Sequence, residues 1–172
     1  MVRDVLRPLL GLAIAVSAVV LFSTSRVPAQ SIEPRQPTAR DACPVCGMFV
    51  APHPEWLAHI VFNDGSELFF DGCKDLFKYL VARDRFAPDR RDLEPVGIFV
   101  TSYYDGSPIR ARDAHFVIGS DAYGPMGVEL VPHHTAEAAN EFLRDHNGSR
   151  VVRFDDVTAE LLDDLGEAGR VR

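Results

Sequence analysis

Apolar residues recur along the chain with two different spacings, and these spacings predict strands and helices in a defined order. Residues 57–63 form an apolar run, Asp64-Gly65 is a strong hairpin signal, and residues 66–70 are expected as the partner strand. Apolar residues then follow at intervals of three or four. This spacing predicts an amphipathic helix over 72–83, for which Asp71 can serve as the N-cap.

The same two spacings continue to the end of the chain. The further expected elements are, in chain order, a charged loop at 84–95, a strand at 96–103, a turn at 105–106, a short strand at 109–112, a strand at 115–119, a turn-rich loop at 120–127, a strand at 128–132, a helix at 135–146, a strand at 151–154 and a short helix at 158–165. Thr135 is expected to cap its helix, and Asn147-Gly148 is expected to end it.

The order hairpin, helix, strand therefore occurs twice. Neither copy is large enough to bury a good core alone, so we expect the two to pack together. The pattern predicts an α+β domain over 42–172, built as a pseudo-repeat of two ββαβ units at about 42–112 and 113–172.

The N-terminal residues have the pattern of a secretory signal peptide over 1–29. Arg3 and Arg7 make a basic start, 9–22 is almost continuously apolar, and Val27-Pro28-Ala29 suits a signal peptidase. The apolar run is shorter than the roughly 20 residues of a spanning helix. We expect a periplasmic protein, and contact with the membrane only if this segment stays uncleaved as an anchor.

Residues 30–41 are polar, contain two prolines and are expected to form a flexible linker. No cysteine directly follows the apolar run, so the usual acylation site of a lipoprotein is absent from this position. The chain carries a formal net charge of −7 at pH 7. This acidic balance argues against nucleic acid as a partner.

Cys43-x-x-Cys46 is the first candidate for chemistry, and it has three interpretations. The pair can chelate one metal ion from a tight turn that Gly47 permits, open and close as a redox disulfide, or form a static disulfide. The residues after Cys46 include Pro52 and Pro54 and make a poor helix start. Because a thioredoxin-like pair opens a helix, this context disfavours the redox interpretation.

The two methionines outside the signal segment narrow the choice of metal. Met48 and Met126 each adjoin a glycine in a turn, whereas a core methionine normally lies in an apolar periodic run. Thioether and thiolate together select Cu(I), which prefers soft donors. If the two turns lie close together, Cys46, Met48 and Met126 form a three-coordinate sulfur site. The alternative is that both methionines fill gaps.

Cys73 and His53 are weaker candidates for metal ligation. Cys73 lies near a helix start, where the helix dipole favours thiolate, yet its spacing places it on the buried stripe of that helix. It can also pair with Cys43 or Cys46. His53 follows Met48 in a proline-rich loop. No phosphate-binding, serine-hydrolase or metalloprotease motif is present, so we do not expect an enzyme.

Five segments together resemble the NosL family of nitrous oxide reductase accessory proteins. They are Cys43-Pro-Val-Cys-Gly-Met-Phe-Val, Ile60-Val-Phe-Asn-Asp-Gly, Phe70-Asp-Gly-Cys-Lys-Asp-Leu, Ala114-His-Phe-Val-Ile-Gly-Ser and Gly124-Pro-Met-Gly-Val-Glu-Leu-Val-Pro. The resemblance runs from about Ala42 to Asp155. The joint occurrence of the Cys-Gly-Met and Gly-Pro-Met-Gly motifs, in this order, is its most specific feature.

The resemblance implies a periplasmic Cu(I) chaperone that supplies copper to nitrous oxide reductase or to a maturation factor of that system. It also implies a fold of two ββαβ units, akin to part of organomercurial lyase, with Cys46, Met48 and Met126 as ligands. Typical members of the family are lipoproteins. Two alternatives stay open, namely a thiol-disulfide reductant that uses Cys43 and Cys46, and an interaction module with a structural disulfide.

Overall fold

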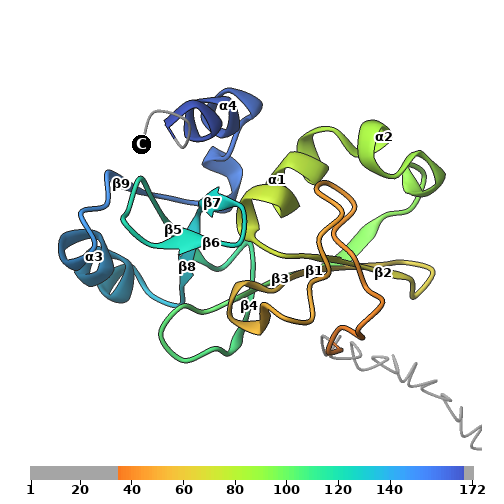
Figure 1. The fold of residues 1–172 in the computed structure, drawn as a ribbon, viewed down its shortest axis with the longest axis horizontal. Helices are drawn as coiled ribbons and strands as arrows, with labels where there is room; N and C mark the ends of the chain where they lie inside the picture. Colours follow the sequence, from red (N-terminus) through yellow and green to blue (C-terminus); the bar gives the residue numbers. More distant parts are fainter. Residues whose placement is uncertain (1–34, 169–172) are drawn as a thin grey trace, which may run out of the picture. The chain divides into compact units, whose positions relative to one another are not determined.

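The computed structural model describes residues 35–168 (Figure 1). The expected signal peptide and the first residues of the expected linker therefore lie outside the described residues. The strands are β1 Ala58–Phe62, β2 Glu67–Phe70, β3 Pro95–Thr101, β4 Pro108–Arg110, β5 His115–Ile118, β6 Tyr123–Gly124, β7 Gly127–Val128, β8 Val131–His133 and β9 Arg150–Val152. The helices are α1 Cys73–Val81, α2 Arg83–Phe86, α3 Ala136–Asp145 and α4 Ala159–Ala168, with 3-10 turns at Pro54–Trp56, Pro88–Arg90 and Phe154–Asp156.

All strand pairs of the described chain are antiparallel, in three sheets. The largest has the order β2-β1-β3-β4, the second β8-β5-β9, and β6 pairs with β7 alone. In the two larger sheets the strand before the helix and the strand after it flank the same central strand. The fold is mixed α+β, as the hydrophobic pattern predicts.

Both halves of the chain contribute to one main core. Phe77 of α1 contacts Phe116 of β5 edge-on, with ring centroids 5.3 Å apart, and Phe154 at 5.2 Å. Helix α4 also lies against α1. A smaller cluster around Phe142 fills the space between α3 and the second sheet. The sharing of one core by both halves agrees with the expectation that neither half buries enough apolar surface alone.

The ends of α3 follow the sequence closely. Thr135 Oγ1 accepts a hydrogen bond from the Ala138 N–H at 3.1 Å, as an N-cap does. At the other end Asn147 adopts φ +53°, and the Gly148 N–H reaches the Leu143 carbonyl at 2.8 Å. This is the left-handed helix ending that Asn147-Gly148 predicts.

Three expected features differ in the structure. Gly72, rather than Asp71, is the N-cap of α1, because the Asp71 carboxyl is engaged elsewhere. The expected loop 84–95 is largely taken up by α2, which begins at Arg83, and by a 3-10 turn. The Arg83 guanidinium holds this segment together by donating hydrogen bonds to two of its carbonyls. The expected strand 128–132 is split between β7 and β8, because Glu129 turns its side chain toward α1.

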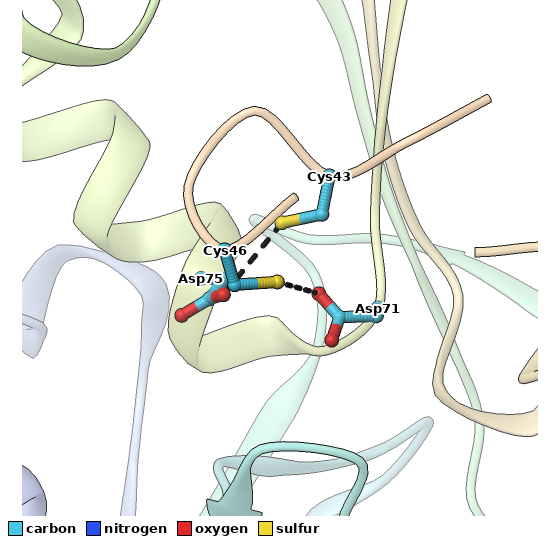
Figure 2. Close-up of side chains that lie close together, drawn as sticks. All are labelled: Cys43, Cys46, Asp71 and Asp75. Carbon is cyan, nitrogen blue, oxygen red and sulfur yellow. Dashed lines mark hydrogen bonds between the residues drawn. The ribbon is translucent and has the colours of Figure 1, made fainter. Parts of the chain in front are cut away.

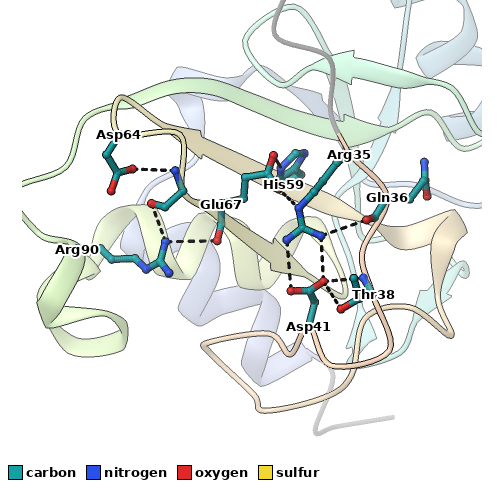
Figure 3. A network of polar contacts seen from close by, with 9 residues as sticks. Arg35, Gln36, Thr38, Asp41, His59, Asp64, Glu67 and Arg90 are labelled. Atoms are coloured by element: carbon teal, nitrogen blue, oxygen red, sulfur yellow. Dashed lines mark hydrogen bonds and ion pairs between the residues drawn. The ribbon is translucent and has the colours of Figure 1, made fainter.

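Residues 35–41, within the expected linker, lie against the first sheet (Figure 3). The Arg35 guanidinium forms ion pairs with Asp41, at 3.1 Å, and with Glu67 of β2. It also lies over the Phe69 ring, 4.3 Å from the centroid. His59 stacks on the same ring at 4.5 Å. Arg35, the first described residue, therefore already contacts the domain. Within 35–168, no helix is long and apolar enough to span a membrane.

Candidate metal centre

The segment from Cys43 to Met48 folds into a closed turn. The Cys43 N–H donates to the Met48 carbonyl at 2.8 Å, and the Gly47 N–H donates to the Cys43 carbonyl at the same distance. Gly47 has a φ of +79°, a left-handed conformation that favours glycine. The turn brings the two Sγ atoms within 4.8 Å of each other.

Two carboxylates join the two thiols (Figure 2). The Sγ atoms of Cys43 and Cys46 and one oxygen each of Asp71 and Asp75 all lie within 4.8 Å of one another. Cys46 Sγ donates to Asp71 Oδ1 at 3.2 Å, and Cys43 Sγ donates to Asp75 Oδ2 at 3.6 Å. Within 35–168, these four form the one group of three or more His, Cys, Asp and Glu residues packed closely enough to hold a metal ion.

Burial favours the protonated form of the two thiols at neutral pH. Burial raises the pKa of Cys46 to about 11 and raises the pKa of the more deeply buried Cys43 further. Both thiols can therefore donate hydrogen bonds to the carboxylates. A cation that binds the sulfurs must displace these protons.

The turns that carry Met48 and Met126 both contact the start of helix α1. Met48 ends the cysteine turn and is half-buried, whereas Met126 lies in the turn between β6 and β7 and is 42% exposed. The Lys74 ammonium, in the first turn of α1, donates to the Met126 carbonyl at 2.7 Å. Asp71 and Asp75, which contact the thiols, flank Lys74. The thiol pair and the Met126 turn thus both contact residues 71–75 at the start of α1.

Cys73 and His53 lie outside the group of four. Cys73 is 2% exposed within the main core, and burial raises the pKa of its thiol. His53 is half-buried just before the 3-10 turn at Pro54–Trp56. All three cysteines are free thiols in the structure.

Sequence reasoning missed Asp71 and Asp75. Asp71 has the residue type of an N-cap, and Asp75 has the residue type of a solvated helix surface. The available signal was their spacing of four next to Cys73, which places two acids beside an apolar stripe. Both are 1% exposed, and a buried carboxylate needs a partner.

The group offers two soft sulfur donors and two hard oxygen donors. Soft sulfur favours Cu(I), whereas carboxylates favour harder divalent ions. Because each thiol already has a carboxylate acceptor, the site can hold its sulfurs in place before any metal arrives. This arrangement suits the binding of a soft cation with the release of protons.

Comparisons with known proteins agree with this chemistry. The NosL family model matches residues 34–162. The copper-binding lipoprotein NosL of Achromobacter cycloclastes is 30% identical over 165 residues, which cover 91% of this chain and 84% of the relative. The protein of the same description from Stutzerimonas stutzeri is 29% identical over 134 residues, which cover 77% and 70%.

The fold also matches a solved structure. The copper chaperone NosL from Shewanella denitrificans superposes with a TM-score of 0.61 at 22% identity, covering 74% of this chain and 97% of that protein. This likeness concerns the fold. Because the family model covers most of the chain, including both the Cys-Gly-Met and the Gly-Pro-Met-Gly turns, this chain belongs to the NosL family.

Proposed function

We propose that this protein is a periplasmic chaperone that binds Cu(I) and passes it to a partner enzyme. The observation that carries the proposal is the thiol pair Cys43 and Cys46, held within 4.8 Å of each other and of two acceptor carboxylates. The relatives described as copper-binding support the choice of metal.

The proposed ligands are the Cys43 and Cys46 sulfurs together with the thioethers of Met48 and Met126. Soft donors suit Cu(I), and zinc gains little from thioethers. Asp71 and Asp75 act in this scheme as hydrogen-bond acceptors that orient the thiols. Hydrogen-bonding partners of this kind commonly tune metal affinity about 10- to 100-fold.

Exposure at one side of the site favours transfer by ligand exchange. Cys43 is 1% exposed, Cys46 is half-buried, and Met126 is exposed, so an incoming ligand can reach the copper from the side of Met126. Phe49 and Tyr123, which are close in the sequence to the two methionines, are exposed aromatic residues. We propose that they form the surface on which a partner docks.

The test is a competition for Cu(I) between the reduced protein and a chromophoric chelator. We expect Cys46→Ser to lower the affinity strongly, and Met126→Leu to lower it by about tenfold, as the loss of one weak ligand does. Cys73→Ala is the matched control, because it removes a thiol outside the group of four and should leave the affinity unchanged. Failure of the wild-type protein to compete for copper contradicts the proposal.

The client in this proposal is nitrous oxide reductase or a maturation factor of that enzyme. The support is the membership of the NosL family and the signal-like residues 1–29. In this scheme the two ββαβ units act as a pseudo-repeat that brings the turns around Met48 and Met126 to one end of the fold. Copper transfer from the loaded chaperone to the copper-free reductase, followed by the visible spectrum of the reductase, tests the client.

The reductant hypothesis is less well supported by the site. A reductant needs a thiolate nucleophile, yet burial raises the pKa of both thiols. Reduction of insulin that depends on Cys43 and Cys46 would support this alternative. A disulfide that resists mild reductant, in a protein that ignores copper, would favour the interaction module.

A further inference from the structure

The Gly-Pro-Met-Gly turn is attached to α1 by a buried lysine. The Lys74 ammonium donates to the carbonyl of Met126 at 2.7 Å and to that of Val128 at 2.6 Å. Lys74 is only 5% exposed, so these two carbonyls take the place of water as hydrogen-bond acceptors. The contacts join residues 52 and 54 positions apart, so they are a feature of the tertiary fold.

A second contact joins the same two segments, with the acceptor on the side chain of Glu129 and the donor on the backbone of α1. Glu129 Oε2 accepts a hydrogen bond from the Lys74 backbone N–H at 2.8 Å. The N-cap of α1, Gly72, has no side chain, so this glutamate takes the place of a capping residue. The contact needs only an acceptor oxygen, which the carboxyl offers whether it is ionised or protonated.

Two glycines make room for the glutamate side chain. A Cβ atom on Gly72 would lie 2.3 Å from Glu129 Oε1, and a Cβ on Gly124 would lie 2.6 Å from Glu129 Cγ. Neither distance is possible without a shift of the glutamate or of the backbone. Glu129 itself is 1% exposed. The side chain is thus enclosed between α1 and the β6–β7 hairpin.

The lysine and the glutamate therefore form a reciprocal clasp between one helix turn and one hairpin. Asp75 in the same helix turn accepts a hydrogen bond from Cys43, and Asp71, just before the N-cap, accepts one from Cys46. The clasp holds the backbone of Met126, whereas the Met126 side chain remains exposed. The clasp thus fixes the backbone from which the Met126 side chain extends, and it leaves the thioether free to take part in ligand exchange.

The geometry points to Lys74 and Glu129 as positioning residues that hold Met126 at a fixed place relative to the thiol pair, so that its thioether can complete the copper site. The inference rests on the proposed function, because it takes Met126 as a ligand. It adds two residues that do not touch the metal but determine the affinity through Met126.

The test combines Lys74→Leu, which keeps an apolar side chain and loses the donors without adding a sulfur, with Met126→Leu. We expect each single variant to bind Cu(I) about tenfold more weakly and to lose one sulfur neighbour of copper in X-ray absorption. Because both act through the same ligand, the double variant should be no weaker than Met126→Leu alone. Arg85→Leu, which removes a surface charge, should leave affinity and sulfur count unchanged.

A purely structural role would give a different result. Lys74→Leu would then unfold at lower urea while keeping the copper affinity and the sulfur count, and this outcome overturns the inference. The inference is also overturned if the loss of copper affinity in the double variant equals the product of the two single losses. If Met126→Leu binds copper as tightly as the wild-type protein, the inference is wrong but the proposal of copper binding stands. If the wild-type protein binds no copper, both proposals are wrong.

A second pair of variants covers the case in which Lys74→Leu does not fold. Glu129→Gln keeps an acceptor for the Lys74 N–H and should retain the affinity within about threefold. Glu129→Ala removes the acceptor and should lower the affinity about tenfold, with the loss of one sulfur neighbour. Equal affinities for these two variants would contradict a positioning role for Glu129.

Discussion

Loading of the protein with Cu(I) should release about two protons per copper at neutral pH. Burial raises the pKa of Cys46 to about 11 and that of Cys43 further, and both thiols donate to carboxylates. A thiol with a pKa of about 11 is ionised at only about one part in 10,000 at pH 7. Each cysteine that becomes a thiolate ligand must therefore give up about one proton.

The number of protons released also determines how the copper affinity depends on pH. Because copper binds the deprotonated sulfurs, the affinity should rise about 100-fold for each pH unit between pH 6 and pH 8, and fall by the same factor as the pH decreases. The proton count is measured by calorimetry of Cu(I) transfer from a weak complex, in buffers of different ionisation enthalpy. Cys46→Ser should reduce the count to about one, and Cys73→Ala should leave it at about two.

Two results would refute this reasoning in different ways. Release of no protons at pH 7 means that the thiolates exist before copper arrives, which contradicts thiols that donate to Asp71 and Asp75. Release of only one proton by the wild-type protein means that one cysteine stays protonated in the complex. The second result would remove that cysteine from the ligand set.

Three further predictions concern stability. Thr135→Ala should cost about 1 kcal/mol in urea unfolding, because the helix loses its N-cap. Phe77→Ala should cost about 3–5 kcal/mol, because it opens a cavity in the shared core, whereas Phe49→Ala at an exposed site should stay within about 0.5 kcal/mol of wild type. Burial lowers the pKa of His59 and of His133 from 6.5 to about 4, so the unfolded chain binds more protons between these values. Stability should therefore fall as the pH drops from 6.5 toward 4, and replacing both histidines by phenylalanine should flatten the urea midpoint over that window.

The sequence by itself determined the local features of this protein. Hydrophobic spacing located α1, α3 and the strands of both larger sheets, because spacing depends on neighbouring residues. The Cys43 to Met48 turn followed from a glycine in the right place. The same local chemistry, two thiols beside two thioethers in glycine-containing turns, was enough to suggest Cu(I).

The tertiary structure alone decided which distant residues support the site. The contacts of Asp71 and Asp75 with the thiols join residues 25 and 32 positions apart, and the contact of Glu129 with Lys74 spans 55. Viewed in the sequence, these residues are an N-cap candidate and ordinary surface charges. They differ from such residues only in their burial, and burial depends on how the two halves of the chain pack around one core.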